Sequence, residues 1–132
     1  MIISTRGRYA LRLMVDLAEH NTGDFIPLQE IAERQEISEK YLERIITVLV
    51  QNKMILGHRG KGGGYKLNKT PAEYSVGSIL ELTEESLAPV ACLAKDAAVC
   101  EKAKNCKTLP MWEKLNTLID GFFAKVTIAD LL

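Results

Sequence analysis

Apolar side chains recur at helical spacing in the first half of the chain and predict three helices. The first apolar series has intervals of 3, 1, 3 and 1 behind a cap at Ser4 or Thr5, and its members are Ala10, Leu13, Met14, Leu17 and Ala18. A short second helix starts at Pro27, and Ser38 caps a third whose inward positions are Tyr41, Leu42, Ile45, Ile46, Leu49 and Val50. Two short helices joined by a tight turn are typical of a helix-turn-helix motif.

The pattern changes from helical to extended after Asn52. Residues 54–59 and 65–67 predict two strands, and the glycine-rich residues 60–64 predict the turn of a β-hairpin. Glycine allows positive φ at such a tip and lets backbone N–H groups come close to a phosphate. Residues 1–69 therefore predict a winged helix-turn-helix DNA-binding region.

The rest of the chain predicts a connecting region, 70–107, and a dimerisation helix with its tail, 108–132. Residues 71–85 predict a fourth helix, whereas residues 86–107 have weak periodicity and predict a loop. Thr108 can cap the last helix, with Pro110 in its first turn, and its apolar stripe is Leu109, Trp112, Leu115, Leu118, Ile119, Phe122 and Phe123. Because that stripe is large for one helix, we expect it to pair in a homodimer. The expected fold is mainly α-helical with one small β-hairpin.

Composition narrows the class of protein. Hydrophobic residues make up 47% of the chain, which is too many for disorder, and no apolar run is long enough to span a membrane. The first residues lack the regions of a secretory signal, so we expect a cytoplasmic location. Residues 1–69 hold eleven Lys and Arg against eight Asp and Glu, and residues 70–132 hold six against nine. A basic front and an acidic rear suit a protein that meets phosphate with one face.

The outward face of the third predicted helix carries side chains that can read DNA. In helix-turn-helix proteins the first turns of the second helix meet base edges. Arg44 can bind guanine, Glu43 can accept from a cytosine amino group, and Lys40 can contact phosphate or base. The alternative interpretation is that these charged residues only form the solvent-exposed face of the helix and do not bind DNA. The candidates on this helix are Ser38, Lys40, Tyr41, Glu43 and Arg44.

The hairpin favours the DNA-binding interpretation. Arg59, Lys61 and Lys66 surround the glycine tip, where they can supply sequence-independent phosphate contacts. Arg59 is also placed to enter a minor groove, and Gly62 completes the candidate set at the tip. A nucleotide-binding loop is excluded because the GxxxxGK[ST] pattern is absent and no helix follows.

Cys92, Cys100 and Cys106 have the spacing C-x7-C-x5-C. An odd number of cysteines in a cytoplasmic chain argues against a disulfide framework, and the spacing argues against a zinc knuckle. Three thiolates on a flexible loop can hold an iron–sulfur cluster, [2Fe–2S] or [4Fe–4S], if a fourth ligand is found. Redox thiols or a buried set of cysteines remain alternatives, and Asp96 or Glu101 is an acidic candidate for the fourth ligand.

Four segments resemble the IscR-type family of bacterial winged-helix transcription regulators: STRGRYALRLMVDLA, ISEKYLERI, RGKGGGYKL and VGSILELTE. The resemblance covers nearly the whole chain, including three cysteines before a helix with a tryptophan. It implies a homodimer whose last long helix crosses its partner, and double-stranded DNA as the ligand. It also implies that Tyr41, Glu43, Arg44 and Arg59 take part in DNA recognition, and that the cysteines hold a cluster that senses iron–sulfur supply or redox state.

The chain departs from the family pattern at the fourth ligand of the cluster. The family often has a histidine three residues after the last cysteine, where this chain has Leu109. Some members use an acidic residue at the position of Arg8 as the fourth ligand, and an arginine cannot take that role here. The histidines of this chain, His20 and His58, both lie in the DNA-binding half. An exogenous molecule or a residue of the partner subunit is a further possible fourth ligand.

Other functions remain as alternatives to a cluster-sensing regulator. The same fold can serve a cluster-free thiol or metabolite-linked regulator, and the three cysteines alone would suit an iron–sulfur carrier. No Ser–His–Asp set, HExxH motif or nucleotide loop supports catalysis, so we do not expect an enzyme.

Overall fold

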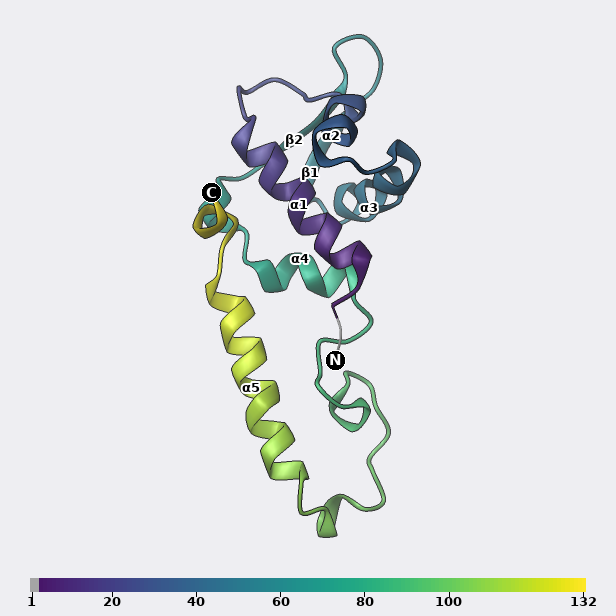
Figure 1. Cartoon of the computed structure of the whole chain (residues 1–132), viewed down its shortest axis with the longest axis vertical. Coiled ribbons are helices and arrows are strands. Elements are labelled where there is room, and N and C mark those ends of the chain that lie inside the picture. Colours follow the sequence, from purple (N-terminus) through teal and green to yellow (C-terminus); the bar gives the residue numbers. More distant parts are fainter. Residues whose placement is uncertain (1–2) are drawn as a thin grey trace.

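A computed structural model describes residues 3–132 as a winged part, residues 5–83, and an arm, residues 84–125 (Figure 1). The winged part holds helices α1 (Thr5–Glu19), α2 (Leu28–Gln35), α3 (Glu39–Gln51) and α4 (Val76–Thr83), with strands β1 (Ile55–His58) and β2 (Gly64–Leu67) between α3 and α4. The arm holds α5 (Leu109–Lys125) and extends away from the hairpin tip. This architecture confirms the expected mainly helical fold with one small hairpin.

Serine side chains begin three of the helices. The hydroxyl oxygens of Ser4, Ser38 and Ser75 each accept a hydrogen bond from a backbone N–H in the first turn of α1, α3 and α4, at 3.0, 3.2 and 3.1 Å. Such caps satisfy donors that have no partner inside the helix. Of the two predicted caps for α1, Ser4 is therefore the one used.

The fourth helix is shorter than predicted. Residues 71–85 contain a 3₁₀ turn (Pro71–Glu73), an extended Tyr74, and then α4. Tyr74 is buried, and its hydroxyl donates to the Met54 carbonyl at 2.8 Å and accepts the backbone N–H of Asn68 at 3.1 Å. Its own carbonyl accepts the N–H of Ile128 at 2.9 Å. These long-range bonds hold Tyr74 out of helical geometry, which local periodicity could not reveal.

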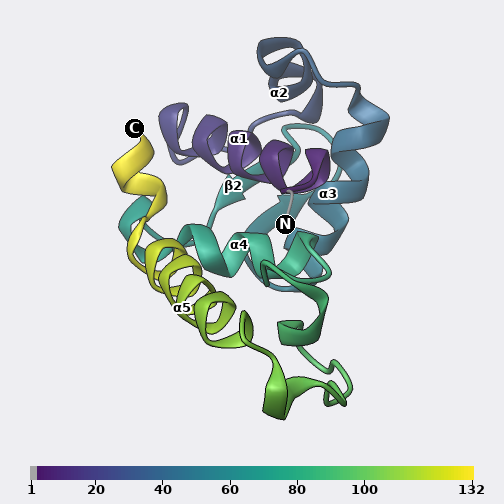
Figure 2. The same cartoon turned by 60° about the horizontal axis from the view of Figure 1, so that its bottom comes forward.

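The hydrophobic core lies entirely in the winged part and the C-terminal turn. Its fully buried side chains come from α1, α2, α3, α4 and β1, joined by Tyr74 before α4 and by Ile128 of the last turn. Helix α5 has no buried residue; its C-terminal part packs against α4, and the rest of the helix runs away from α4 at the edge of the molecule (Figure 1, Figure 2). No helix within residues 3–132 is both long and apolar enough to cross a membrane.

Candidate nucleic-acid interface and cysteine segment

Helix α3 presents its charged residues to solvent and its apolar residues to the core. Leu42, Ile45 and Leu49 are fully buried, which fixes the rotation of the helix. The predicted residues Lys40, Glu43 and Arg44 are exposed on the opposite side, and Ser38 is exposed at the cap. The structure therefore brings four of the five predicted residues of this helix to one accessible face.

Tyr41 lies differently from the other candidates. It is half-buried, and its ring meets the edge of Tyr9 on α1 with centroids 5.5 Å apart. The Arg12 guanidinium lies over the Tyr9 ring, 5.2 Å from the ring centroid. Tyr41 thus links the reading helix to α1 as well as bordering the accessible face.

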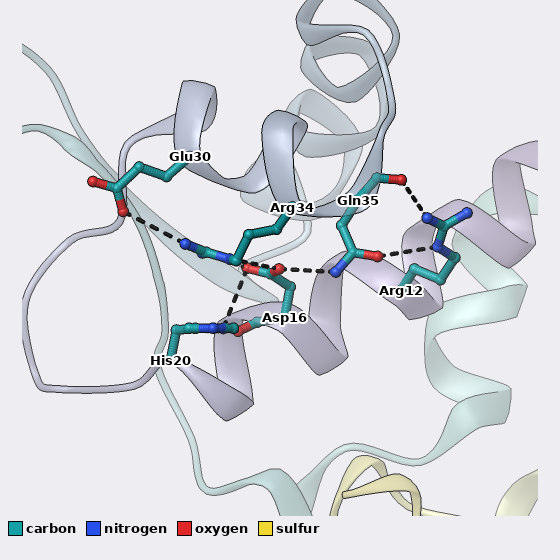
Figure 3. A network of polar contacts seen from close by, with 6 residues as sticks. All are labelled: Arg12, Asp16, His20, Glu30, Arg34 and Gln35. Atoms are coloured by element: carbon teal, nitrogen blue, oxygen red, sulfur yellow. Dashed lines mark hydrogen bonds and ion pairs between the residues drawn. The ribbon is translucent and has the colours of Figure 1, made fainter.

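A buried carboxylate holds α2 against α1 (Figure 3). Asp16 is fully buried and accepts two hydrogen bonds from Arg34, at 2.7 and 3.0 Å, and one from the Gln35 amide at 2.8 Å. Arg12 in turn donates to the Gln35 side chain at 3.0 Å and to its carbonyl oxygen. A buried charge is tolerated only when it is paired in this way. The network therefore fixes α2, the first helix of the helix-turn-helix, relative to α1.

Sequence reasoning missed this network, although a signal for it was present. Asp16 stands three residues after Leu13 and one before Leu17, on the apolar face of α1. A carboxylate at such a position needs a cationic partner on the neighbouring element, because an unpaired buried charge is costly.

Replacing Asp16 with asparagine is expected to lower the free energy of unfolding by roughly 2 to 3 kcal/mol at pH 7, since the Arg34 charge loses its partner. Burial alone would raise the pKa of Asp16, but hydrogen bonds from Arg34 and Gln35 and the Arg34 charge lower it below the ordinary value of 3.8. The stabilisation is therefore present above pH 3.8 and is lost as the pH falls through the lower folded-state pKa. Urea unfolding between pH 7 and pH 3 measures this difference.

The matched control for that experiment is Glu30→Gln. Glu30 lies 3.6 Å from the same arginine but is 58% exposed, so its loss is expected to cost about 0.5 kcal/mol or less. Equal losses for both variants, or a difference independent of pH, would contradict the assignment.

The wing is a two-stranded hairpin that one residue before α2 ties to the rest of the chain. β1 and β2 pair antiparallel with Ile55 opposite Leu67 and His58 opposite Gly64. Ile26 adds a bridge on the other side of β2, exchanging hydrogen bonds of 2.8 and 2.9 Å with Tyr65. Gly64 allows this approach, since a Cβ there would overlap the Ile26 carbonyl.

The tip of the wing exposes Arg59, Lys61 and Gly62, as predicted from the sequence. Gly60 and Gly62 have φ of 90° and 74°, a region that other residues rarely adopt. Lys66, by contrast, points away from the tip: its Nζ donates to the Gly23 carbonyl at 3.1 Å and lies 4.6 Å from the centre of the Phe25 ring. The expectation that Lys66 belongs to the tip cluster is therefore wrong, because the 21–25 turn holds it.

Helix α5 has two apolar faces. Trp112, Ile119 and Phe123 are half-buried on one face. The second face is formed by Met111, Leu115, Leu118 and Phe122, which are 53%, 38%, 70% and 63% exposed. Their spacing of 4, 3 and 4 residues is that of a helix–helix seam. We call these four residues the α5 stripe.

The cysteines lie in the segment 84–108, between α4 and α5. This segment contains two 3₁₀ turns, Ala91–Leu93 and Ala103–Asn105, and no longer element. Cys92 and Cys100 are exposed, Cys106 is half-buried, and all three are free thiols. Across residues 3–132 no three His, Cys, Asp or Glu side chains are gathered closely enough to hold a metal ion. The donor types suit iron and sulfide, but the thiols must first be drawn together.

Cys106 stands just before α5 and differs from the other two cysteines. A hydrogen bond from the Thr108 hydroxyl, 3.5 Å from Cys106 Sγ, lowers the pKa of the thiol, helped by the backbone N–H groups of Thr108 and Leu109. A lower pKa raises the fraction of reactive thiolate at neutral pH.

In the metal-free protein Cys106 is therefore expected to react with iodoacetamide faster than Cys92 and Cys100 at pH 7. Thr108→Val removes the hydroxyl and is expected to slow Cys106 severalfold, because less thiolate is present. Peptide mass spectrometry after short labelling gives the three rates, and Cys92 and Cys100 in the same variant are the control. An unchanged Cys106 rate would show that Thr108 does not control this thiol.

Comparison with known proteins gives a consistent picture. The family model Rrf2, described as iron-dependent transcriptional regulator, matches residues 3–132. The HTH-type transcriptional regulator IscR of Serratia proteamaculans is 36% identical over the whole chain, which covers 79% of that protein, and IscR of Yersinia pseudotuberculosis is 35% identical with the same coverage.

Solved structures agree with the sequence comparison. T. potens IscR superimposes with a TM-score of 0.75 at 31% identity, covering 99% of this chain and 85% of that one. CymR, described as the global cysteine regulator of B. subtilis, superimposes with a TM-score of 0.80 at 29% identity, covering 99% and 95%. These likenesses confirm the IscR-type resemblance and the winged-helix fold.

Proposed function

Because this chain belongs to the Rrf2 family of transcriptional regulators, we propose that two copies of it bind double-stranded DNA with paired α3 helices and wings. The exposed side chains of Lys40, Glu43 and Arg44 then meet a major groove, and Arg59 and Lys61 meet the flanking backbone or minor groove. The observation that carries the proposal is that the buried face of α3 and the Ile26–β2 bridge hold both surfaces in one rigid unit. The protein would act in the bacterial cytoplasm, where its DNA is.

The α5 stripe supports the homodimer. A stripe of large apolar side chains on a helix that adds nothing to the core is typical of an interface. Its heptad-like spacing suits a second copy of the same helix, packed across a two-fold axis. Such pairing would present two reading units to two half-sites of one duplex.

Cys92, Cys100 and Cys106 would hold the iron–sulfur cluster of a sensing regulator. The cluster would supply a redox-sensitive and oxygen-sensitive cross-link between the three thiolates. The chain itself would supply the three thiolates and the segment 84–108, which carries short 3₁₀ turns between α4 and α5. Binding of the thiolates to one cluster would order this segment. Because this segment joins α4 of the winged part to α5 of the proposed dimer interface, its ordering would alter the tilt or spacing of the two reading units. A fourth ligand must come from elsewhere than residue 109, which is leucine.

A cluster-free thiol regulator is the second candidate, and the surroundings of Cys106 favour it. The pKa of this thiol is lowered by hydrogen bonds from its own neighbours in the chain, Thr108 and Leu109. In this case oxidation or modification of Cys106 would be the signal.

The test begins with a DNA duplex that the wild-type protein enriches from random-sequence DNA. We call this DNA the selected duplex. Protein purified without oxygen is assayed for iron, sulfide and visible absorption, and its affinity for the selected duplex is compared with that of metal-free protein. A coloured protein whose affinity differs from the metal-free form supports cluster sensing. A colourless protein whose affinity changes only on thiol oxidation supports the second candidate, and failure to enrich any duplex rejects DNA binding.

A further inference from the structure

Two helix ends that are far apart in the sequence cap each other. The backbone N–H and the hydroxyl of Ser4, at the start of α1, donate to Glu84 Oε1 at 2.9 and 2.8 Å. Arg6 donates through Nη2 and Nε to the Thr83 carbonyl, at the end of α4, at 2.6 and 3.2 Å. A carboxylate at a helix N-terminus and a guanidinium at a helix C-terminus both complement the helix dipole. We call these four residues the cross-cap.

Gly7 makes room for the cross-cap. A Cβ at this position would overlap Glu84 Oε1 and lie 3.2 Å from Leu80 Cδ2. Glycine is disfavoured inside a helix, and the φ of Gly7 is not one that demands it. The glycine therefore serves the close approach of the Glu84 carboxylate to α1, which shows that this contact is built into the sequence.

The cross-cap stands where the cysteine segment meets the reading helix. α4 ends at Thr83, so Glu84 is the first residue of the segment that carries the three cysteines. A hollow of about 660 Å³ beside it is lined by the cap Ser4 and by Arg6 of α1, by Tyr41 and Arg44 of α3, and by residues 83–86. In Figure 2 the start of α1 lies between the end of α4 and α3.

A short chain of contacts runs from Glu84 to the DNA-reading face. Glu84 holds Ser4, and Ser4 caps the turn of α1 that leads to Tyr9. The Tyr9 ring meets Tyr41 of α3 edge-on at 5.5 Å, one turn before Ile45 enters the core. The start of α1 thus stands between the Glu84 carboxylate on one side and Tyr41 with the hollow that Arg44 borders on the other.

We propose that Glu84 is a positioning residue that couples the cysteine segment to the DNA-reading helix through Ser4 and α1. With the carboxylate on Ser4, the start of α1 and the Tyr9–Tyr41 contact are held as in this structure. When the segment 84–108 is pulled into another arrangement, Glu84 leaves Ser4 and the reading face loses that support. The coupling is reciprocal, so DNA bound to α3 must steady residues 84–90 in turn. This inference rests on the proposed DNA-binding function.

Hydrogen exchange on the full-length, metal-free protein tests the coupling without needing a cluster. Adding the selected duplex is expected to slow amide exchange of residues 84–90 by about fivefold or more in the wild type. Glu84→Ala should remove that slowing. Ser4→Ala should reduce it, because only the backbone N–H of residue 4 then still donates to Glu84. The double variant should lose no more than Glu84→Ala alone, because both substitutions act through one contact. Glu85→Ala is the control, since Glu85 is exposed and adjacent, and it should keep the wild-type response.

Four outcomes would overturn the inference. It fails if the wild type binds the duplex with no change at residues 84–90, if Glu84→Ala keeps the slowing, or if Glu85→Ala loses it equally. If the wild type enriches no duplex at all, the proposed function fails and the inference falls with it. Unchanged exchange around Leu13 and Leu17 shows that α1 remains folded in each variant, and Ser4→Ala tests the same contact should Glu84→Ala not fold.

Discussion

Replacing Arg59 and Lys61 together with alanine is expected to weaken binding to the selected duplex by roughly 100-fold, because two cationic contacts to DNA are lost. Both side chains stand exposed at the wing tip, where the paired strands and the Ile26 bridge hold them in place. Their loss should also make the salt dependence shallower, by about one in the log–log slope for each phosphate contact removed. Fluorescence anisotropy at several salt concentrations gives both quantities.

The matched control removes the same charge from another place. Lys102 and Lys104 are exposed residues of the cysteine segment, at the opposite end of the molecule from the wing (Figure 1). Lys102→Ala with Lys104→Ala therefore lowers the net charge equally without touching the wing. If this pair weakened binding as much as the wing pair, general attraction rather than a wing contact would explain the loss. A wing pair with wild-type affinity would contradict the proposed interface.

Replacing Leu118 with glutamate is expected to convert the proposed dimer into a monomer at micromolar concentration. Leu118 is 70% exposed at the centre of the α5 stripe, so each copy would bring an unpaired carboxylate into the apolar seam. A cost of about 3 kcal/mol for that burial corresponds to a roughly 100-fold weaker dimer. Sedimentation should show the mass falling from twice 14.7 kDa to that of one chain, and DNA affinity should fall with it because one half-site is weaker than two.

Thr117→Glu provides the control for this variant. Thr117 is the neighbouring residue on the polar side of α5, where its hydroxyl donates to the Glu113 carbonyl at 3.1 Å. The same new charge placed there should leave the dimer intact. A wild-type protein that sediments as a monomer, or a Leu118→Glu variant that stays dimeric, would reject the α5 stripe as the interface.

The helices and hairpin of the winged part could be predicted because their signals are local. Ser4 and Ser38 cap their helices as expected, and the glycine run after Arg59 forms the turn of the wing. The outward direction of Lys40, Glu43 and Arg44 followed from the buried positions on the same helix. The family followed from several segments together, and the matched relatives confirm it.

Long-range contacts decided the features that the sequence did not reveal. Tyr74 leaves helical geometry because partners at Met54 and Ile128 hold it, and Lys66 turns from the wing tip because Gly23 and Phe25 lie beneath it. The pairing of Asp16 with Arg34 depends on where α2 packs. The separation of the three thiols depends on a segment whose weak periodicity specifies no single arrangement.

Chain-local chemistry thus determined most helices and strands of the winged part and the outward face of α3, since caps, glycine turns and apolar spacing act within a few positions. Only the tertiary structure decided which distant groups meet: Asp16 with Arg34, Ser4 with Glu84, and Ile26 with Tyr65. Those pairs form because the packed core brings helix ends and strand edges together, where charges and backbone groups that have left water must find partners.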